Sequence, residues 1–224
     1  MRPLFTILCM IVGLASQLTG QDAMERKISM SLGPQNAFYV EIPGADDKTA
    51  EKTFYEFVKE YGKLKENKKA KEHFMMATKI PVINGTSPLD VYAKFEEGKG
   101  MTTTYVWVDL GGAFVNTSDH ASQTKAVRQF MYDYFVAVRK KVVTEELKKE
   151  EKNHADLEKD LRKLKDKNED YHKDIEKAKQ KIMEAEKNIE KNVVDQENKV
   201  KEIDTQKAVV DKVVEILNNL GKMD

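Results

Sequence analysis

Hydrophobic and polar residues alternate in short runs between positions 36 and 115, which is the period of half-buried β-strands. The first run contains Phe38, Val40 and Ile42 and ends at a turn formed by Pro43 and Gly44. Further runs predict strands over residues 74–80, 91–96 and 101–110, with a hairpin near residues 98–100 and a short return strand over 113–115.

A helical spacing of apolar residues separates the first strand from the others. Asp46 and Asp47 offer an N-cap, and the apolar residues after them recur three or four positions apart on one helix face: Ala50, Phe54, Phe57, Tyr61 and Leu64. A strand, a helix, a run of strands and a final helix predict an α+β fold, with a small antiparallel sheet and helices on one face.

A single long helix is predicted after the strands, because neither glycine nor proline occurs between Gly112 and Gly221. We expect apolar residues in the range 127–142 to pack on the sheet. From Val143 onward, an unbroken heptad frame predicts a coiled coil of about 120 Å at 1.5 Å per residue. Its seam comprises Leu147, Leu157, Leu161, Leu164, Asn168, Tyr171, Ile175, Ile182, Ile189, Ile203, Val210, Val213, Leu217 and Leu220.

The residues that flank this seam favour a parallel, in-register dimer or trimer of the chain with itself. In that arrangement a flanking residue faces the one five positions later on the partner, which creates attractive pairs: Asp160 with Lys165, Asp174 with Lys179, Lys181 with Glu186 and Glu202 with Lys207. Asn168 at a core position favours two strands, because its amide must meet its own copy across the seam.

Two parts of the seam are irregular. Asn192, Lys199 and Gln206 are polar at core positions, so the seam is weakest there, and an antiparallel helical hairpin within one chain is the alternative. Near the C-terminal end, the apolar surface is wider than a two-helix seam requires: Val209, Val210, Val213, Val214, Ile216, Leu217 and Leu220. This end is either a tightly zipped terminus or a contact for a second protein.

The N-terminal residues have the order of a secretory signal peptide, which we predict over residues 1–20. Arg2 precedes an apolar run from Leu4 to Leu14 that is too short to span a bilayer, and small and polar residues follow it. The only cysteine, Cys9, lies in this segment. We therefore expect an exported protein, periplasmic or extracellular, without disulfides and without a transmembrane segment after cleavage.

Composition distinguishes a compact part of the chain from a polar one. The 224 residues include 38 basic and 38 acidic side chains, and this balance does not favour nucleic acid as a partner. Charged residues make up 34% of the chain and aromatic residues only 8%. Almost all aromatic residues lie between Phe38 and Phe135, so we expect the hydrophobic core there.

Residues with catalytic chemistry are sparse. The four histidines lack metal-ligand spacing, and no phosphate loop, nucleotide fingerprint or nucleophile elbow is present. The sequence therefore predicts a protein that is not an enzyme and that holds neither cofactor nor metal. One candidate ligand face lies on the strand over 101–110 and consists of Tyr105, Trp107 and Asp109.

These patterns predict an exported, non-catalytic interaction protein with a signal peptide over 1–20, an α+β domain over 21–142 and a coiled coil over 143–221. Oligomerisation would place several heads together and raise their avidity. One alternative is a periplasmic holdase, since the exported, lysine-rich and cysteine-poor chain resembles the coiled-coil tentacle chaperones of outer-membrane biogenesis. Another is a small-ligand or peptide-binding head that uses the face of Tyr105 and Trp107.

Overall fold

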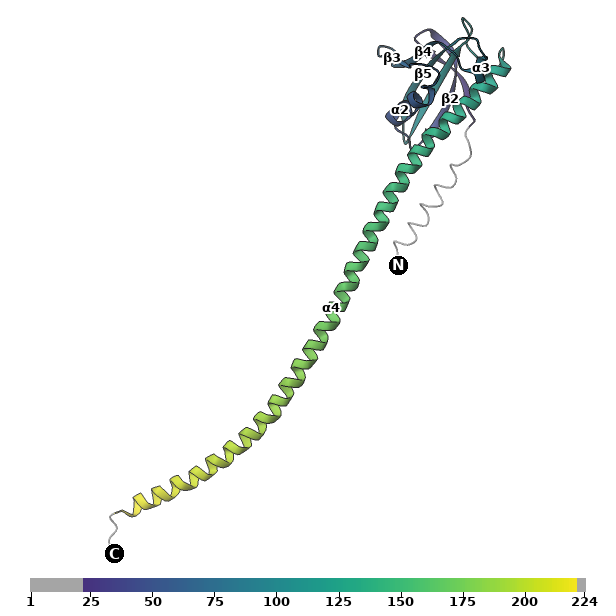
Figure 1. Cartoon of the computed structure of the whole chain (residues 1–224). Helices are drawn as coiled ribbons and strands as arrows, with labels where there is room; N and C mark the ends of the chain where they lie inside the picture. Colours follow the sequence, from purple (N-terminus) through teal and green to yellow (C-terminus); the bar gives the residue numbers. More distant parts are fainter. Residues whose placement is uncertain (1–21, 221–224) are drawn as a thin grey trace. The chain divides into compact units, whose positions relative to one another are not determined.

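The computed structural model describes residues 22–220, so the predicted signal peptide lies outside the described residues. The chain divides into two compact units that meet between Glu151 and Lys152. The first unit contains a sheet with its helices, and the described part of the second is helical (Figure 1). The predicted α+β fold, an antiparallel sheet followed by a long C-terminal helix, is confirmed.

Six antiparallel strands form the sheet, in the order β1-β2-β6-β5-β4-β3. The strands are β1 Met24–Met30, β2 Gly33–Pro43, β3 Lys65–Asn67, β4 Glu72–Thr78, β5 Leu89–Gly98 and β6 Met101–Asp109. β5 and β6 make the predicted hairpin, in which Gly98 pairs with Met101. The predicted return strand over 113–115 is reduced to one bridge between Asp109 and Phe114.

The sequence patterns did not reveal β1 and β3, the two edge strands of the sheet. β1 reads MERKISM, and its charged residues obscure the apolar alternation, which is common in edge strands that must not pair with other chains. β3 has only three residues, too few for a period to show. Both strands are therefore defined by their neighbours, β2 and β4, rather than by their own pattern.

Three helices accompany the strands within residues 22–220: α2 Asp47–Val58, α3 Pro81–Asn84 and α4 Ala121–Asn219. The predicted N-cap of α2 is confirmed, since Asp46 accepts a hydrogen bond from the backbone N–H of Thr49 at 2.7 Å. α2 ends earlier than its apolar spacing predicted, because the N–H of Tyr61 turns back to the carbonyl of Val58. Tyr61 and Leu64 consequently lie beyond the helix.

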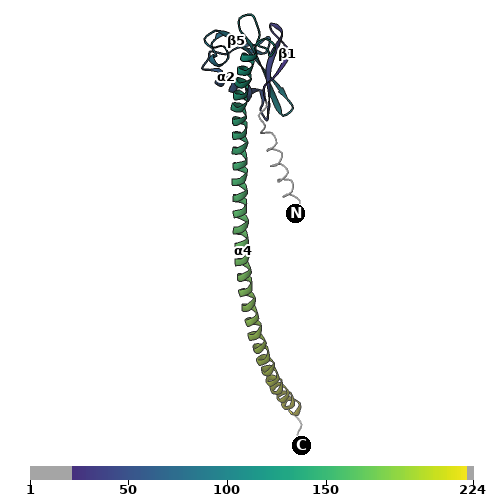
Figure 2. The ribbon, with the colours of Figure 1, turned by 90° about the vertical axis from the view of Figure 1, so that its right-hand side faces the viewer.

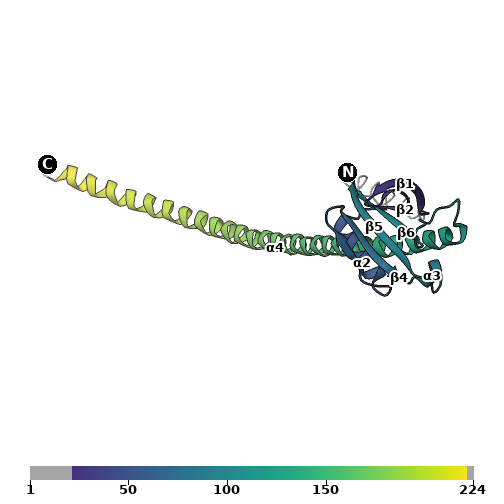
Figure 3. The ribbon, with the colours of Figure 1, turned by 90° about the horizontal axis from the view of Figure 1, so that it is seen from above.

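Both faces of the sheet are packed, as the alternation of β6 predicted. α2 and the first part of α4 cover one face, on which Phe54 and Tyr134 join Val106 in the main core (Figure 2). The rings of Phe54 and Tyr134 lie edge to face with their centroids 5.1 Å apart. The opposite face carries a smaller cluster around Trp107 and Tyr105. In Figure 3 the strands cross the first part of α4.

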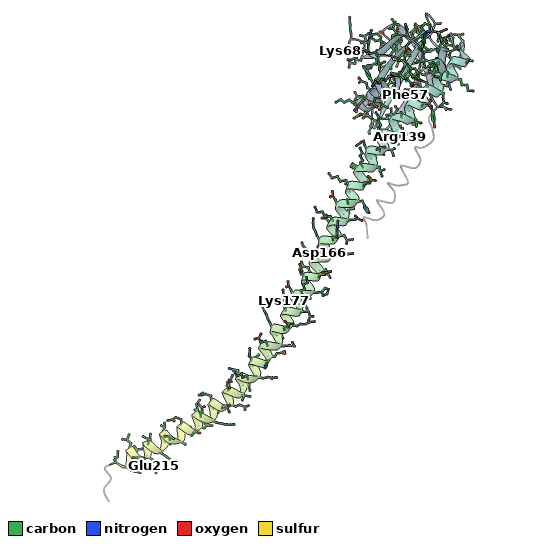
Figure 4. All side chains as sticks on the ribbon, in the orientation of Figure 1. Phe57, Lys68, Arg139, Asp166, Lys177 and Glu215 are labelled. Carbon is green, nitrogen blue, oxygen red and sulfur yellow. The ribbon has the colours of Figure 1, made fainter. Side chains whose placement is uncertain are left out.

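The second unit makes no comparable core within the described chain. From Lys152 to Leu220 every side chain is exposed, and α4 continues without interruption to Asn219. Figure 4 shows Asp166, Lys177 and Glu215 projecting from this helix. Within the single chain, this part of α4 is therefore held by helical backbone hydrogen bonds and by exposed side-chain pairs along the helix, without a packed core.

Candidate functional site

The predicted seam is an exposed apolar stripe on α4. Every predicted seam residue from Leu147 to Leu220 is exposed in the single chain. Large apolar side chains exposed at this regular spacing are unusual on a monomeric protein and mark an interaction surface. We therefore treat this stripe, which we call the seam, as the candidate functional site.

The seam begins on a side of α4 that the sheet does not cover. Val138 and Val142 are buried in the core of the first unit, whereas Val143 and Leu147 are exposed. Successive residues of an α-helix are about 100° apart around its axis, so Val142 and Val143 point in clearly different directions. A second helix could therefore reach Val143 and Leu147 without displacing the sheet.

Charged residues beside the seam form ion pairs along the same helix. Asp160 pairs with Lys163 at 2.9 Å and Asp174 with Lys177 at 3.4 Å, in each case three residues along the helix. These pairs are exposed, so each contributes only about 0.2–0.5 kcal/mol to helix stability. Asp160 and Asp174 also belong to the predicted attractive pairs between chains, and their exposure leaves them available for that role.

A shallow hollow of about 750 Å³ lies in the first unit between the start of α2 and residues 140–149 of α4. Its lining mixes basic and acidic side chains: Asp46, Lys52, Lys140, Lys141, Glu145, Glu146 and Lys149. Several of these already have partners, since Lys141 pairs with Glu56 and Glu145 with Lys148. The hydrogen bond from Lys141 lowers the pKa of the Glu56 carboxyl. Because the hollow is open and carries charges of both signs, it does not indicate which kind of ligand would bind there.

The three residues of the predicted ligand face have different positions in the structure. Trp107 is 0% exposed and Tyr105 is also buried, so both are core residues of the smaller cluster. Burial raises the pKa of the Tyr105 phenol. Asp109 instead accepts hydrogen bonds from the backbone N–H groups of Gly111 and Gly112 at 2.9 and 2.7 Å. Its carboxylate therefore stabilises the turn after β6.

One buried acid, Glu72, was missed by the sequence analysis. Only 3% of Glu72 is exposed, and its Oε1 accepts a hydrogen bond from the N–H of Ser31 at 2.9 Å. Its Oε2 is buried without a hydrogen-bond partner among the described residues. Ser31 lies in the turn between β1 and β2, so this bond joins that turn to β4. No sequence signal could reveal a contact between residues 41 positions apart.

Neither a metal-binding cluster nor a comparison with known proteins indicates another site. Within residues 22–220, no group of three His, Cys, Asp or Glu side chains could hold a metal ion. None of the helices described there is long and apolar enough to cross a bilayer. No protein-family model, curated protein or solved structure matches the chain. The seam stays the candidate with the most specific pattern.

Proposed function

We propose that the protein is an exported, non-catalytic interaction protein whose α+β head is presented on a parallel coiled coil of two copies. The observation that carries this proposal is the seam, an apolar heptad stripe exposed along α4. Fully burying one Leu or Ile side chain contributes about 1.5–3 kcal/mol, so a repeated stripe provides a large driving force for association. A second copy of the chain brings a matching stripe.

The residue types along the seam favour two helices over three. Ile175, Ile182 and Ile189 occupy the first core position, and Leu157 and Leu164 occupy the second. β-Branched residues at the first position are typical of parallel dimers, although the second position of the heptads that contain Ile175 and Ile182 holds Ala178 and Ala185 instead of Leu. Asn168 supports the same choice, since two copies of its amide can hydrogen-bond across a two-helix seam.

Presentation of two heads explains how a chain without evident catalytic chemistry acts. Joining two weakly binding heads makes the second binding event intramolecular, which raises the overall affinity without new contacts. The sheet leaves the first seam residues, Val143 and Leu147, uncovered. The heads can therefore stay folded while the helices pair from this point onward.

The proposal is tested by comparing substitutions at two neighbouring residues. Ile182 and Met183 are 57% and 62% exposed in the single chain, but only Ile182 lies in the seam. Light scattering after size exclusion should give the mass of two chains for the wild type and for Met183→Lys, whereas Ile182→Lys should shift the protein towards one chain. A monomeric wild type, or equal effects of the two substitutions, would contradict the proposal.

A second candidate role is favoured by the wide apolar surface at the C-terminal end. Val209, Val213 and Ile216 are all exposed there. This surface could serve as the contact for a second protein, including an unfolded client in the holdase alternative. A holdase should suppress aggregation of a reduced, unfolding client protein, and a double substitution Val209→Glu and Ile216→Glu should abolish this suppression. A pure presentation module should leave the aggregation unchanged in both forms.

A further inference from the structure

The last third of α4 carries a second, shifted apolar stripe. We infer that the seam rotates around the helix between Ala185 and Val193, so that a second copy of the chain contacts Val193 and Val200 in place of Asn192 and Lys199. This inference rests on the proposed function, because it assumes a parallel pair of helices. It assigns different contact residues from those of the unbroken heptad frame.

The spacing of apolar residues locates the rotation. From Leu157 to Ala185 the core positions of the heptad frame, Ala178 and Ala185 among them, alternate between spacings of four and three, but Ile189 and Val193 then follow at two successive spacings of four. Such an extra step is a stutter, which locally unwinds a coiled coil. α4 is continuous from Ala121 to Asn219, so this change in sequence spacing is a change of direction around one helix. Beyond it the stripe continues through Val200, Ile203, Val210, Val214 and Leu217.

The rotation exchanges polar residues for apolar ones at the contact. Val193 is 47% exposed and Val200 is 57% exposed in the single chain, so a partner helix can still bury both side chains. Asn192 and Lys199, the polar residues that leave the contact, already interact on their own helix with Gln196 and Glu202. Gln196 Nε2 donates a hydrogen bond to Asn192 Oδ1 at 2.5 Å.

An open hollow on the surface of α4 lies where the rotated register places a side chain from the partner helix. It measures about 420 Å³ and is lined by Val193, Gln196, Glu197, Val200 and Lys201. The first four lie at positions i, i+3, i+4 and i+7, the arrangement that surrounds a side chain from the facing helix in knobs-into-holes packing. In the rotated register, Gln196 of the second copy is the side chain that enters this hollow.

Charges beside the rotated stripe are compatible with a parallel pair. Lys199 becomes a flanking residue that faces Asp204 of the second copy, while its Nζ lies 2.5 Å from Glu202 on its own helix. The rotation removes the predicted pair between Glu202 and Lys207. It also brings Lys207 to a core position, where the long aliphatic stem can pack while the ammonium group reaches water.

Disulfide trapping between neighbouring positions tests the rotated seam. The experiment uses the full chain with Cys9→Ser, because Cys9 is the only native cysteine. Single substitutions Lys199→Cys and Val200→Cys are compared under mild oxidation, with Ile175→Cys as the reference, since Ile175 is a core residue in either register. A disulfide needs closely spaced Cβ atoms, so Val200→Cys should form the covalent dimer about tenfold faster than Lys199→Cys.

The outcomes separate this inference from the proposed function. If Ile175→Cys forms no covalent dimer, the parallel pair itself is wrong, and the rotated seam is wrong with it. If Ile175→Cys reacts but Lys199→Cys reacts as fast as or faster than Val200→Cys, the parallel pair stands and the rotation is overturned. Failure of both neighbours beside a reactive Ile175→Cys would also overturn it, because the helices would then be apart at this point.

Discussion

Phe54 in the head and Leu161 in the second unit are both large apolar residues on helices, yet their surroundings differ completely. Phe54 is 0% exposed because α4 and the sheet of the same chain cover it, whereas Leu161 is 53% exposed. The two residues represent two situations of an apolar helix face, one removed from water within the chain and one left in contact with water. The head buries its own apolar face, whereas the helix beyond Lys152 leaves its apolar face exposed in the single chain.

This difference predicts two kinds of stability in one chain. Contacts within the head are intramolecular, so the free energy of unfolding of the head should not depend on protein concentration. Contacts along the seam would be intermolecular, so the stability of the distal helix should increase with concentration.

Phe54→Ala should cause the largest loss, about 3–5 kcal/mol in the free energy of unfolding of the head, because it leaves a cavity between α2, α4 and the sheet. Urea unfolding followed by the fluorescence of Trp107, the only tryptophan, measures this change. The loss should be the same in dilute and concentrated protein. A loss that varies with concentration would show that the head core depends on the partner.

Leu161→Ala should cost about 2 kcal/mol per helix, and only in the associated protein, because in the proposed pair Leu161 would be buried by the partner helix and not by its own chain. Thermal melting followed by circular dichroism at several protein concentrations measures it. The unfolding transition of the head, followed by Trp107 fluorescence, should have the same midpoint as in the wild type. Met183→Ala, an exposed position outside the seam, serves as the control and should leave both transitions unchanged.

Tyr134→Phe should reduce the free energy of unfolding of the head by about 1–2 kcal/mol. The Tyr134 hydroxyl donates a hydrogen bond to the Ala50 carbonyl at 2.9 Å and lies 3.1 Å from Thr104 Oγ1, so its removal takes one hydrogen-bond partner from each of these two groups in the core. Burial also raises the pKa of this phenol. Tyr132→Phe, on the exposed side of α4, is the control and should leave the urea midpoint unchanged.

Asp46→Ala should cost about 1 kcal/mol at neutral pH, through loss of the N-cap of α2. Hydrogen bonds from Thr49 hold the pKa of the Asp46 carboxyl below its ordinary value of 3.8. A lowered pKa in the folded state means that this stabilisation is complete above pH 3.8 and is lost as the pH falls further.

The pH dependence itself provides the control for Asp46. The difference in urea midpoint between wild type and Asp46→Ala should shrink below pH 3.8. Asp46→Asn keeps a capping oxygen but cannot titrate. The free energy of unfolding of this variant should therefore lack the part of the pH dependence that comes from the Asp46 carboxyl. A constant difference between wild type and Asp46→Ala from pH 7 to pH 2 would show that the charge of Asp46 plays no part.

Local periodicity made several elements predictable. The alternation along β6 places Tyr105 and Trp107 on one face of the sheet and Val106 and Val108 on the other, because successive residues of a strand point to opposite faces. The N-cap Asp46 and the long helix α4 were predictable for a similar reason. A capping side chain, and the absence of glycine and proline, affect the backbone within a few residues. The seam is of this kind too, since its pattern is complete within one helix.

Local sequence patterns predict the α+β fold, the cap of α2, the hairpin of β5 and β6, and the long helix with its apolar stripe. The folded chain alone reveals that β1 and β3 are strands, that Trp107 is covered, and that Glu72 binds the turn at Ser31. These two groups of features differ in the sequence separation of the residues that define them. A helix face or a strand period repeats within a few residues, whereas an edge strand or a buried carboxylate is defined by neighbours far away in the chain.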